Sequence, residues 1–177
     1  MSRLVVISGC SSGGKSTLLT VLARRGFPVV EEPGRRVVRE ELASGGPALP
    51  WTDDLAFARR VFAIALTELR AANSDGEWTF FDRGLVDAAV ALGYLTGEPV
   101  DVPELRAYHR QVFLTPPWRQ IYVTDAERCH PFEEATAEYE RLVVGYRALG
   151  YTVTVLPQID VQDRADFVLT TLCPFAG

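Results

Sequence analysis

The chain has 177 residues, of which 47% are hydrophobic and 23% charged, and its formal net charge is −5 at pH 7. This length and composition suit a globular domain with a substantial core rather than a disordered protein. The negative net charge argues against a nucleic-acid partner, because affinity for a phosphate backbone depends on clustered Lys and Arg.

The cysteines and the hydrophobic segments indicate the cellular location of the protein. Cys10, Cys129 and Cys173 are odd in number, far apart and without metal-ligand spacing. No stretch approaches the roughly 20 apolar residues that a membrane span needs. We therefore expect free thiols, no membrane partner and a cytoplasmic protein with a single domain over residues 1–177.

Short apolar runs predict five β-strands, at residues 4–8, 27–30, 78–81, 112–114 and 152–156. The first run is continuously apolar, which is typical of a strand buried on both faces. Helical periodicity predicts helices at 15–25, 35–43, 52–73, 85–95, 131–149 and 160–172, and a short one near 101–104. Strands that alternate with helices predict an α/β fold, with a parallel sheet covered by helices on both faces.

Several residues indicate where these helices begin and end. Thr52 and Asp160 are expected N-caps, and Asp101 with Glu104 resembles a capping box. Gly97 is expected to end the helix over 85–95.

A glycine-rich segment after the first strand carries the strongest functional signal. Residues 9–17 read Gly-Cys-Ser-Ser-Gly-Gly-Lys-Ser-Thr, which matches G-x-x-x-x-G-K-[ST] between a buried strand and a helix. Glycines let backbone N–H groups surround a phosphate, and the helix N-terminus adds partial positive charge. The expected nucleotide-binding residues are Gly9, Ser11, Ser12, Gly13, Gly14, Lys15, Ser16 and Thr17.

Two side chains of this loop are expected to have separate tasks. Lys15 would reach the β- and γ-phosphates of ATP, and the Ser16 hydroxyl would ligate Mg²⁺. Lys15 is also the single lysine of the chain. A GTPase of the switch type recognises guanine through an Asn-Lys-x-Asp element. Because the one lysine of this chain lies in the phosphate loop, that element cannot be present and the class is excluded.

Further segments give the chain a family resemblance. Val29-Val30-Glu31-Glu32-Pro33-Gly34-Arg35 and Phe80-Phe81-Asp82-Arg83-Gly84 each follow a predicted strand. With the phosphate loop, they resemble the deoxynucleoside and nicotinamide-riboside kinases. With residues 124–128 and the segment 145–157 included, the sequence more closely resembles a bacterial family of predicted single-domain ATPases, labelled AAA-type although kinase-like. The resemblance covers most of the chain and implies a three-layer P-loop NTPase fold with strand order 2-3-1-4-5.

That strand order implies roles for two acidic residues. Strands lie about 4.8 Å apart, so Asp82 would stand about one spacing from the phosphate loop and Glu32 about two. Asp82 is expected to hold Mg²⁺, and Glu32 to hydrogen-bond an acceptor hydroxyl or take its proton. Three alternatives stay open: Asp82 as a helix cap beside a solvated Arg83, Glu32 as a solvated acid of a pre-proline turn, and Glu31 in the role of Glu32.

The resemblance also implies a closing lid over about residues 117–132. Such a lid brings an arginine to the transferring phosphoryl group, and Arg128 and Arg119 are the candidates. Trp118 stacks on a base or simply packs.

The sequence thus predicts a phosphotransferase that uses ATP and Mg²⁺ and acts on a nucleoside-like or other small hydroxylated molecule. Its expected catalytic residues are Lys15, Glu32, Asp82 and Arg128. A nucleotide-binding regulatory NTPase without a small-molecule acceptor is the alternative, and the acceptor's identity stays open.

Overall fold

The computed structural model describes residues 2–72, 76–121 and 132–173. Its centre is a sheet of β1 (Leu4–Gly9), β2 (Val29–Val30), β3 (Thr79–Asp82), β4 (Gln111–Thr115) and β5 (Thr152–Val155). All neighbouring strands are parallel, in the order β2-β3-β1-β4-β5. The expected α/β fold and strand order are confirmed.

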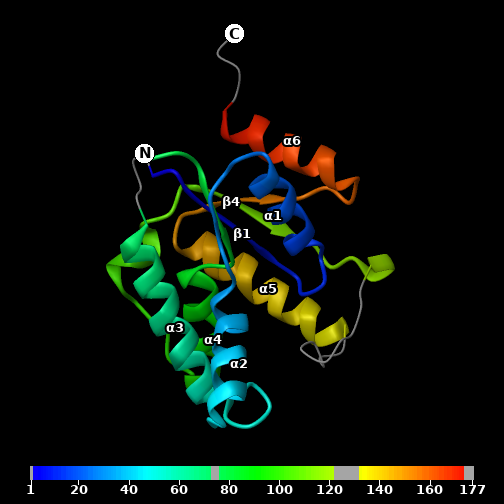
Figure 1. The fold of residues 1–177 in the computed structure, drawn as a ribbon. Coiled ribbons are helices and arrows are strands. Elements are labelled where there is room, and N and C mark those ends of the chain that lie inside the picture. Colours follow the sequence, from blue (N-terminus) through cyan, green and yellow to red (C-terminus); the bar gives the residue numbers. More distant parts are fainter. Residues whose placement is uncertain (1, 73–75, 122–131, 174–177) are drawn as a thin grey trace.

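Helices cover both faces of the sheet (Figure 1). One face carries α1 (Lys15–Arg24) and α6 (Val161–Leu172), and the other carries α4 (Leu85–Thr96) and α5 (Phe132–Ala148). Outside α4 lies α3 (Asp54–Ala71), which contacts α2 (Pro33–Ser44).

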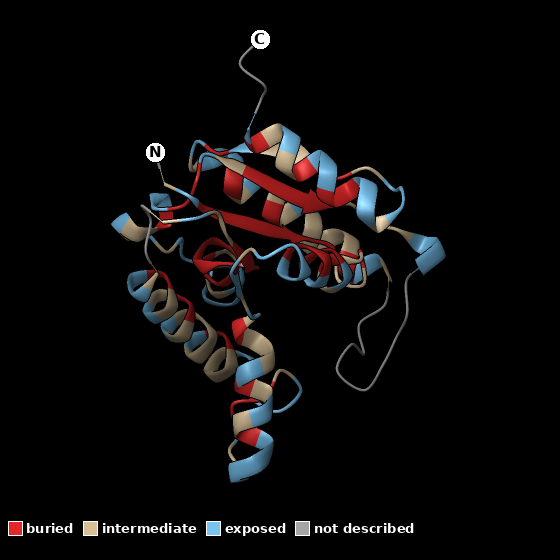
Figure 2. Cartoon of the chain, turned by 45° about the horizontal axis from the view of Figure 1, so that its top comes forward, coloured by how far each residue is buried: buried red, intermediate tan, exposed pale blue. Residues whose placement is uncertain are grey.

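The central strand β1 shows why this arrangement follows from the sequence. Its side chains alternate between the faces: Val5 and Ile7 pack with α1 and α6, whereas Leu4 and Val6 pack with the opposite cluster. Each fully buried side chain of this kind contributes on the order of 1.5–3 kcal/mol. Buried residues accordingly gather on the strands and on the helix surfaces that face them (Figure 2).

Two of the expected helix ends are confirmed. Asp160 caps α6 by accepting a hydrogen bond from the Gln162 amide at 2.8 Å. Gly97 ends α4 in the left-handed conformation, with φ at 75°.

Two others are wrong. Asp53, and not Thr52, caps α3, because its carboxylate accepts a hydrogen bond from the Ala56 amide at 2.9 Å. Asp101 and Glu104 form no capping box: a single 3₁₀ turn, Pro103–Arg106, follows Val102 without a side-chain cap.

The start of α2 matters for the site. The helix begins at Pro33, two residues earlier than expected, because proline with its fixed φ suits a first helical position. Glu32 is therefore the N-cap residue, and Arg35 lies in the first turn. Among the described residues, no helix is both long and apolar enough to span a membrane.

Candidate active site

The phosphate loop lies between β1 and α1, as expected, and is pressed against the end of β4. The Cys10 amide donates to the Thr115 carbonyl at 2.9 Å. Gly9 has φ at 111°, and a methyl carbon there would lie 2.5 Å from the Thr115 main-chain nitrogen. Gly14 has φ at 81° and is the N-cap residue of α1. Glycine at these positions is therefore a requirement of the loop's shape.

Lys15 lies along this loop with its ammonium group inside it. The Nζ atom donates to the Cys10 carbonyl at 2.9 Å and to the Gly9 carbonyl at 3.4 Å. The side chain is buried, and burial followed by the neighbouring Arg83 lowers the pKa of Lys15. A desolvated ammonium that donates to two carbonyls of the described chain is well placed to pair with an anion.

Asp82 ends β3 beside the first strand, since its Cα pairs with that of Ile7 in the sheet. Its side chain is buried, and Oδ1 has no hydrogen-bond partner among the described residues. Burial, and then the nearby Glu32, raise the pKa of Asp82 to about 6. Asp82 is not a helix cap, because Gly84 precedes α4 as its N-cap.

These residues fit a magnesium ion. Asp82 offers an unpartnered carboxylate oxygen, and Ser16 offers a hydroxyl oxygen in the loop. No group of three or more His, Cys, Asp or Glu that could hold a metal occurs in the described part of the chain. Mg²⁺ is usually bound by one or two protein oxygens together with substrate phosphates and water, which is the kind of ligand set that Asp82 and Ser16 offer.

Glu32 and Glu31 face different surroundings. The Glu32 carboxylate accepts from Arg35 Nε at 3.1 Å and lies 3.4 Å from Arg83 Nε. Glu31 is exposed and pairs with Arg39 through two hydrogen bonds of 2.6 and 2.8 Å, and this hydrogen bonding lowers its pKa. Glu32 lines the site's cavity, whereas Glu31 does not.

Arg83 is largely enclosed rather than solvated, with its side chain 14% exposed. Its Nη1 donates to Glu138 on α5 at 2.7 Å and lies 3.5 Å from Asp87 on α4. Burial opposes the charged form, but Glu138, Glu32 and Asp87 more than offset it and raise the pKa of Arg83. The backbone of Arg83 has φ at 63°, which is unusual for a residue other than glycine.

A cavity of about 720 Å³ joins these parts. The phosphate loop forms its middle. One end is lined by Trp118, Ile159, Val161 and Arg164, and the other by residues of α2, α3, α4 and α5 that include Glu32, Arg83 and Glu138. The phosphate loop and Glu32 thus open into one space.

The lid residues are only partly described. Arg119 lies in a 3₁₀ turn, Arg119–Ile121, with its side chain 73% exposed, its guanidinium over the Phe132 ring and a 3.6 Å pair with Glu133. It does not line the cavity. Arg128 and most of the expected lid lie outside the described residues.

A family model described as an AAA domain matches residues 4–164, which is most of the chain. The chain belongs to this AAA-domain family. No curated protein matches the sequence.

Solved structures share the fold of this AAA-domain protein. Deoxyadenosine kinase from M. mycoides with bound dATP has a TM-score of 0.65 at 15% identity, covering 96% of this chain and 98% of that one. Shikimate kinase from Acinetobacter baumannii with shikimate has a TM-score of 0.63 at 16% identity, with coverages of 98% and 94%. The shikimate kinase of Aquifex aeolicus has a TM-score of 0.56 at 15% identity, covering 98% of this chain and 99% of that one. The expected resemblance to P-loop kinases is confirmed at the level of the fold.

Sequence reasoning gave no role to two arginines of this AAA-domain protein. Arg35 bridges the site, because its Nη2 donates to Ser16 Oγ at 3.2 Å while its Nε donates to Glu32. The sequence indicates the contact between Arg35 and Glu32 through their Glu-x-x-Arg spacing, which places both side chains on one helix face.

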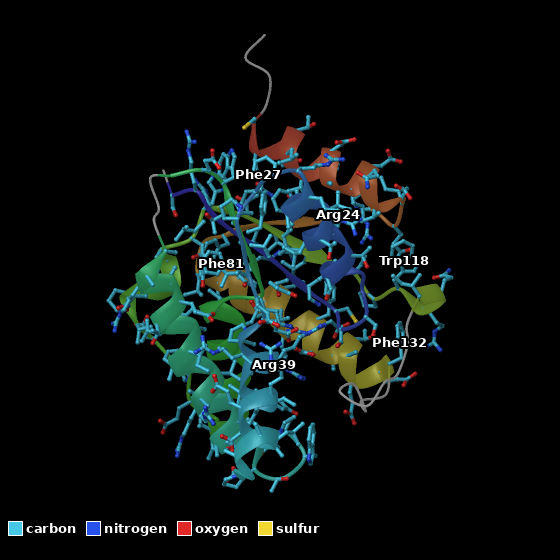
Figure 3. The ribbon with its side chains drawn as sticks, in the orientation of Figure 1. Arg24, Phe27, Arg39, Phe81, Trp118 and Phe132 are labelled. Carbon is cyan, nitrogen blue, oxygen red and sulfur yellow. The ribbon has the colours of Figure 1, made fainter. Side chains whose placement is uncertain are left out.

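Arg164, in the first turn of α6, donates to the Gly13 carbonyl at 3.3 Å and lies 5.5 Å from the centre of the Trp118 ring. Figure 3 shows Trp118 close to this end of α6. Trp118 therefore packs on an arginine while also lining the cavity. Nothing local in the sequence indicates this contact, which joins residues far apart in the chain.

Proposed function

We propose that this protein is an ATP-dependent phosphotransferase that moves the γ-phosphoryl group onto the hydroxyl of a small molecule. The observation that supports this most is the single cavity that extends from the phosphate loop to Glu32 and Arg83. Nucleotide binding alone needs the loop, whereas an acceptor needs space and polar groups beyond it. The shared fold with deoxyadenosine and shikimate kinases agrees with this proposal.

In this proposal the residues of the phosphate loop bind the nucleotide. Backbone amides from Gly9 to Thr17 and the N-terminus of α1 face the phosphates, and Lys15 turns its ammonium to them. Ser16 and Asp82 would hold Mg²⁺, which supplies charge neutralisation on the β- and γ-phosphate oxygens.

Glu32 has the acceptor task. It orients the acceptor hydroxyl or takes its proton, while Arg83 and Arg35 fix the carboxylate by ion pairs. Arg128 remains the proposed lid arginine, since Arg119 is turned toward Phe132 and Glu133.

The test compares the parent protein with Lys15→Ala and Lys15→Arg. Calorimetry measures ATP affinity, and a coupled assay measures ADP formation with Mg²⁺, alone and with a panel of alcohols. We expect slow ADP formation alone and faster formation with an acceptor. Lys15→Ala should lose most ATP affinity or turnover, because it removes the ammonium group that pairs with the phosphates. Lys15→Arg should also be impaired, because its guanidinium is wider than the compact ammonium. Equal ATP binding by parent and Lys15→Ala would overturn the nucleotide site. Binding without acceleration by any alcohol would favour the regulatory NTPase.

A further inference from the structure

The acceptor end of the cavity contains two kinds of surface. We define this acceptor compartment as the part of the cavity beyond the phosphate loop that is bounded by α2, α3, α4 and α5. Its charged residues are Glu32, Arg35, Arg83, Asp87 and Glu138. Its apolar residues are Val38, Pro50, Phe57, Val61, Ala88 and Ala91.

Both cations of the compartment are already matched by carboxylates. Arg35 pairs with Glu32 at 3.1 Å, and Arg83 lies 2.7 Å from Glu138, 3.4 Å from Glu32 and 3.5 Å from Asp87. Three carboxylates thus face two guanidinium groups. A phosphate or carboxylate on the acceptor would have to displace one of these pairs and then lie beside the freed acid.

The nearby groups strengthen this imbalance. Asp82 adds a further carboxyl group near Glu32, and the triphosphate adds further negative charge on the loop side. Arg35 also donates through Nη2 to Ser16 of the phosphate loop. Among the described residues, each guanidinium group of the compartment therefore already has a carboxylate within ion-pair distance, although Arg83 Nε makes no hydrogen bond.

The remaining lining of the compartment is apolar. Within the described lining, the residues that the compartment draws from α2, α3 and α4 beyond the charged cluster include no hydroxyl, amide or imidazole side chain. A nucleobase edge or a polyol placed there would lose its hydrogen bonds to water without replacing them, which is unfavourable. Phe57 and Val61 instead offer surface to an apolar or flat body.

We infer that the acceptor is an alcohol with an apolar or aromatic body and no negative charge. This inference rests on the proposed phosphotransferase function and narrows its substrate class. The acceptor oxygen forms a bond to the γ-phosphorus while the bond from that phosphorus to the β–γ bridging oxygen breaks. The hydroxyl proton passes to Glu32, and ADP and a phosphate monoester are the products.

The test uses three alcohols with the parent protein, ATP and Mg²⁺. The probes are para-methylbenzyl alcohol, para-(hydroxymethyl)benzoate, which differs by a carboxylate in place of a methyl group, and thymidine, a neutral alcohol with a polar base. ADP formation and mass spectrometry of the phosphate ester are measured at equal acceptor concentrations. We expect the methyl compound to be phosphorylated at least about tenfold faster than the carboxylate, because like charges placed together are strongly unfavourable.

A charge substitution in the compartment gives the reciprocal experiment. Ala91→Lys adds an ammonium group to the lining, and Ala63→Lys adds the same group to an exposed position of α3 that does not line the cavity. Ala91→Lys should shift the preference toward para-(hydroxymethyl)benzoate by about tenfold, while Ala63→Lys should leave it unchanged. ATP affinity should be equal in all three proteins.

The outcomes separate this inference from the proposed function. Faster phosphorylation of the carboxylate or of thymidine by the parent protein overturns the inference but leaves the phosphotransferase in place. Phosphorylation of none of the three overturns the inference as well, and if no other alcohol accelerates ADP formation the proposed function fails with it. Equal effects of Ala91→Lys and Ala63→Lys would show that the compartment does not hold the acceptor body.

Discussion

At the scale of single residues, the charged side chains of the site differ in how many partners they have. Glu32 shares Arg35 and Arg83, while Asp82 keeps a buried oxygen without a partner among the described residues. A buried polar atom without a partner costs about 1–3 kcal/mol, so its persistence points to a ligand that completes it. We expect Mg²⁺ to be that ligand.

Asp82→Asn tests this role. The amide keeps the size of the side chain but loses the charge that attracts a divalent cation, so Mg²⁺-dependent ATP binding should weaken by about tenfold or more. Binding of ATP without metal should stay near the parent value. Titration calorimetry with and without Mg²⁺ measures both, and parallel shifts in the two affinities would contradict the metal role.

Glu32→Gln and Glu31→Gln form a matched pair of neighbouring substitutions. Glu32 lines the cavity and Glu31 lies outside it, paired with Arg39. We therefore expect Glu32→Gln to keep ATP affinity but lower phosphoryl transfer by about 10²–10⁴, with a loss at the low end if transfer is largely dissociative. Single-turnover rates with an active acceptor decide this. A larger defect in Glu31→Gln would assign the role to that residue instead.

At the scale of elements, local sequence patterns predicted the type of each segment, helix or strand, more accurately than they predicted its ends. Strand runs and helical periodicity depend on residues close in the chain, so the types of the major elements were correct. Helix ends depend on which of several nearby polar side chains reaches an amide. Asp53 reaches the Ala56 amide, although Thr52 beside it is also a good capping residue.

The phosphate loop is an element whose shape depends on a distant strand. Gly9 combines a positive φ with contact to the Thr115 main chain, whereas Gly26 has a φ of 94° and nothing within 4 Å of an added methyl carbon. Gly26→Ala should therefore cost only the backbone strain, about 1–2 kcal/mol. Gly9→Ala should cost that strain and about 1–3 kcal/mol of overpacking, and should also impair nucleotide binding.

Urea unfolding of both alanine variants measures this difference. The free energies of unfolding should fall more for Gly9→Ala than for Gly26→Ala, and ATP affinity should fall only for Gly9→Ala. Equal losses of stability would mean that the loop moves away from β4 at little cost.

At the scale of the whole molecule, the predictable part of the site is the part that the strand order determines. The order brings the ends of β1, β3 and β2 side by side, so Asp82 and Glu32 could be placed before any side chain was seen. The contacts of Arg35 with Ser16, Arg83 with Glu138 and Arg164 with Gly13 could not, because each joins separate elements through one long side chain. Such contacts depend on packing angles that no local pattern encodes.

The stability of the whole molecule should carry a pH dependence from Asp82. Its pKa in the folded protein, about 6, lies above the ordinary value of 3.8, so the folded state holds this proton more tightly than the unfolded state does. Above pH 6 both states are ionised and burial of the charge disfavours folding. As pH falls from 7 toward 5, Asp82 becomes protonated in the folded state, and its contribution to the free energy of unfolding rises, on the order of 1–2 kcal/mol.

Two other groups have shifted pKa values, and their effects must be separated from that of Asp82. Burial lowers the pKa of His109, so this residue makes the protein less stable as pH falls, while burial raises the pKa of Glu68 and acts in the same direction as Asp82. Both residues remain in Asp82→Asn, whose side chain does not titrate. The difference in free energy of unfolding between parent and variant, measured by urea at pH 7, 6 and 5 without nucleotide or Mg²⁺, therefore isolates Asp82. We expect the parent to gain stability relative to Asp82→Asn as pH falls, and a constant difference would show that Asp82 ionises normally in the folded protein.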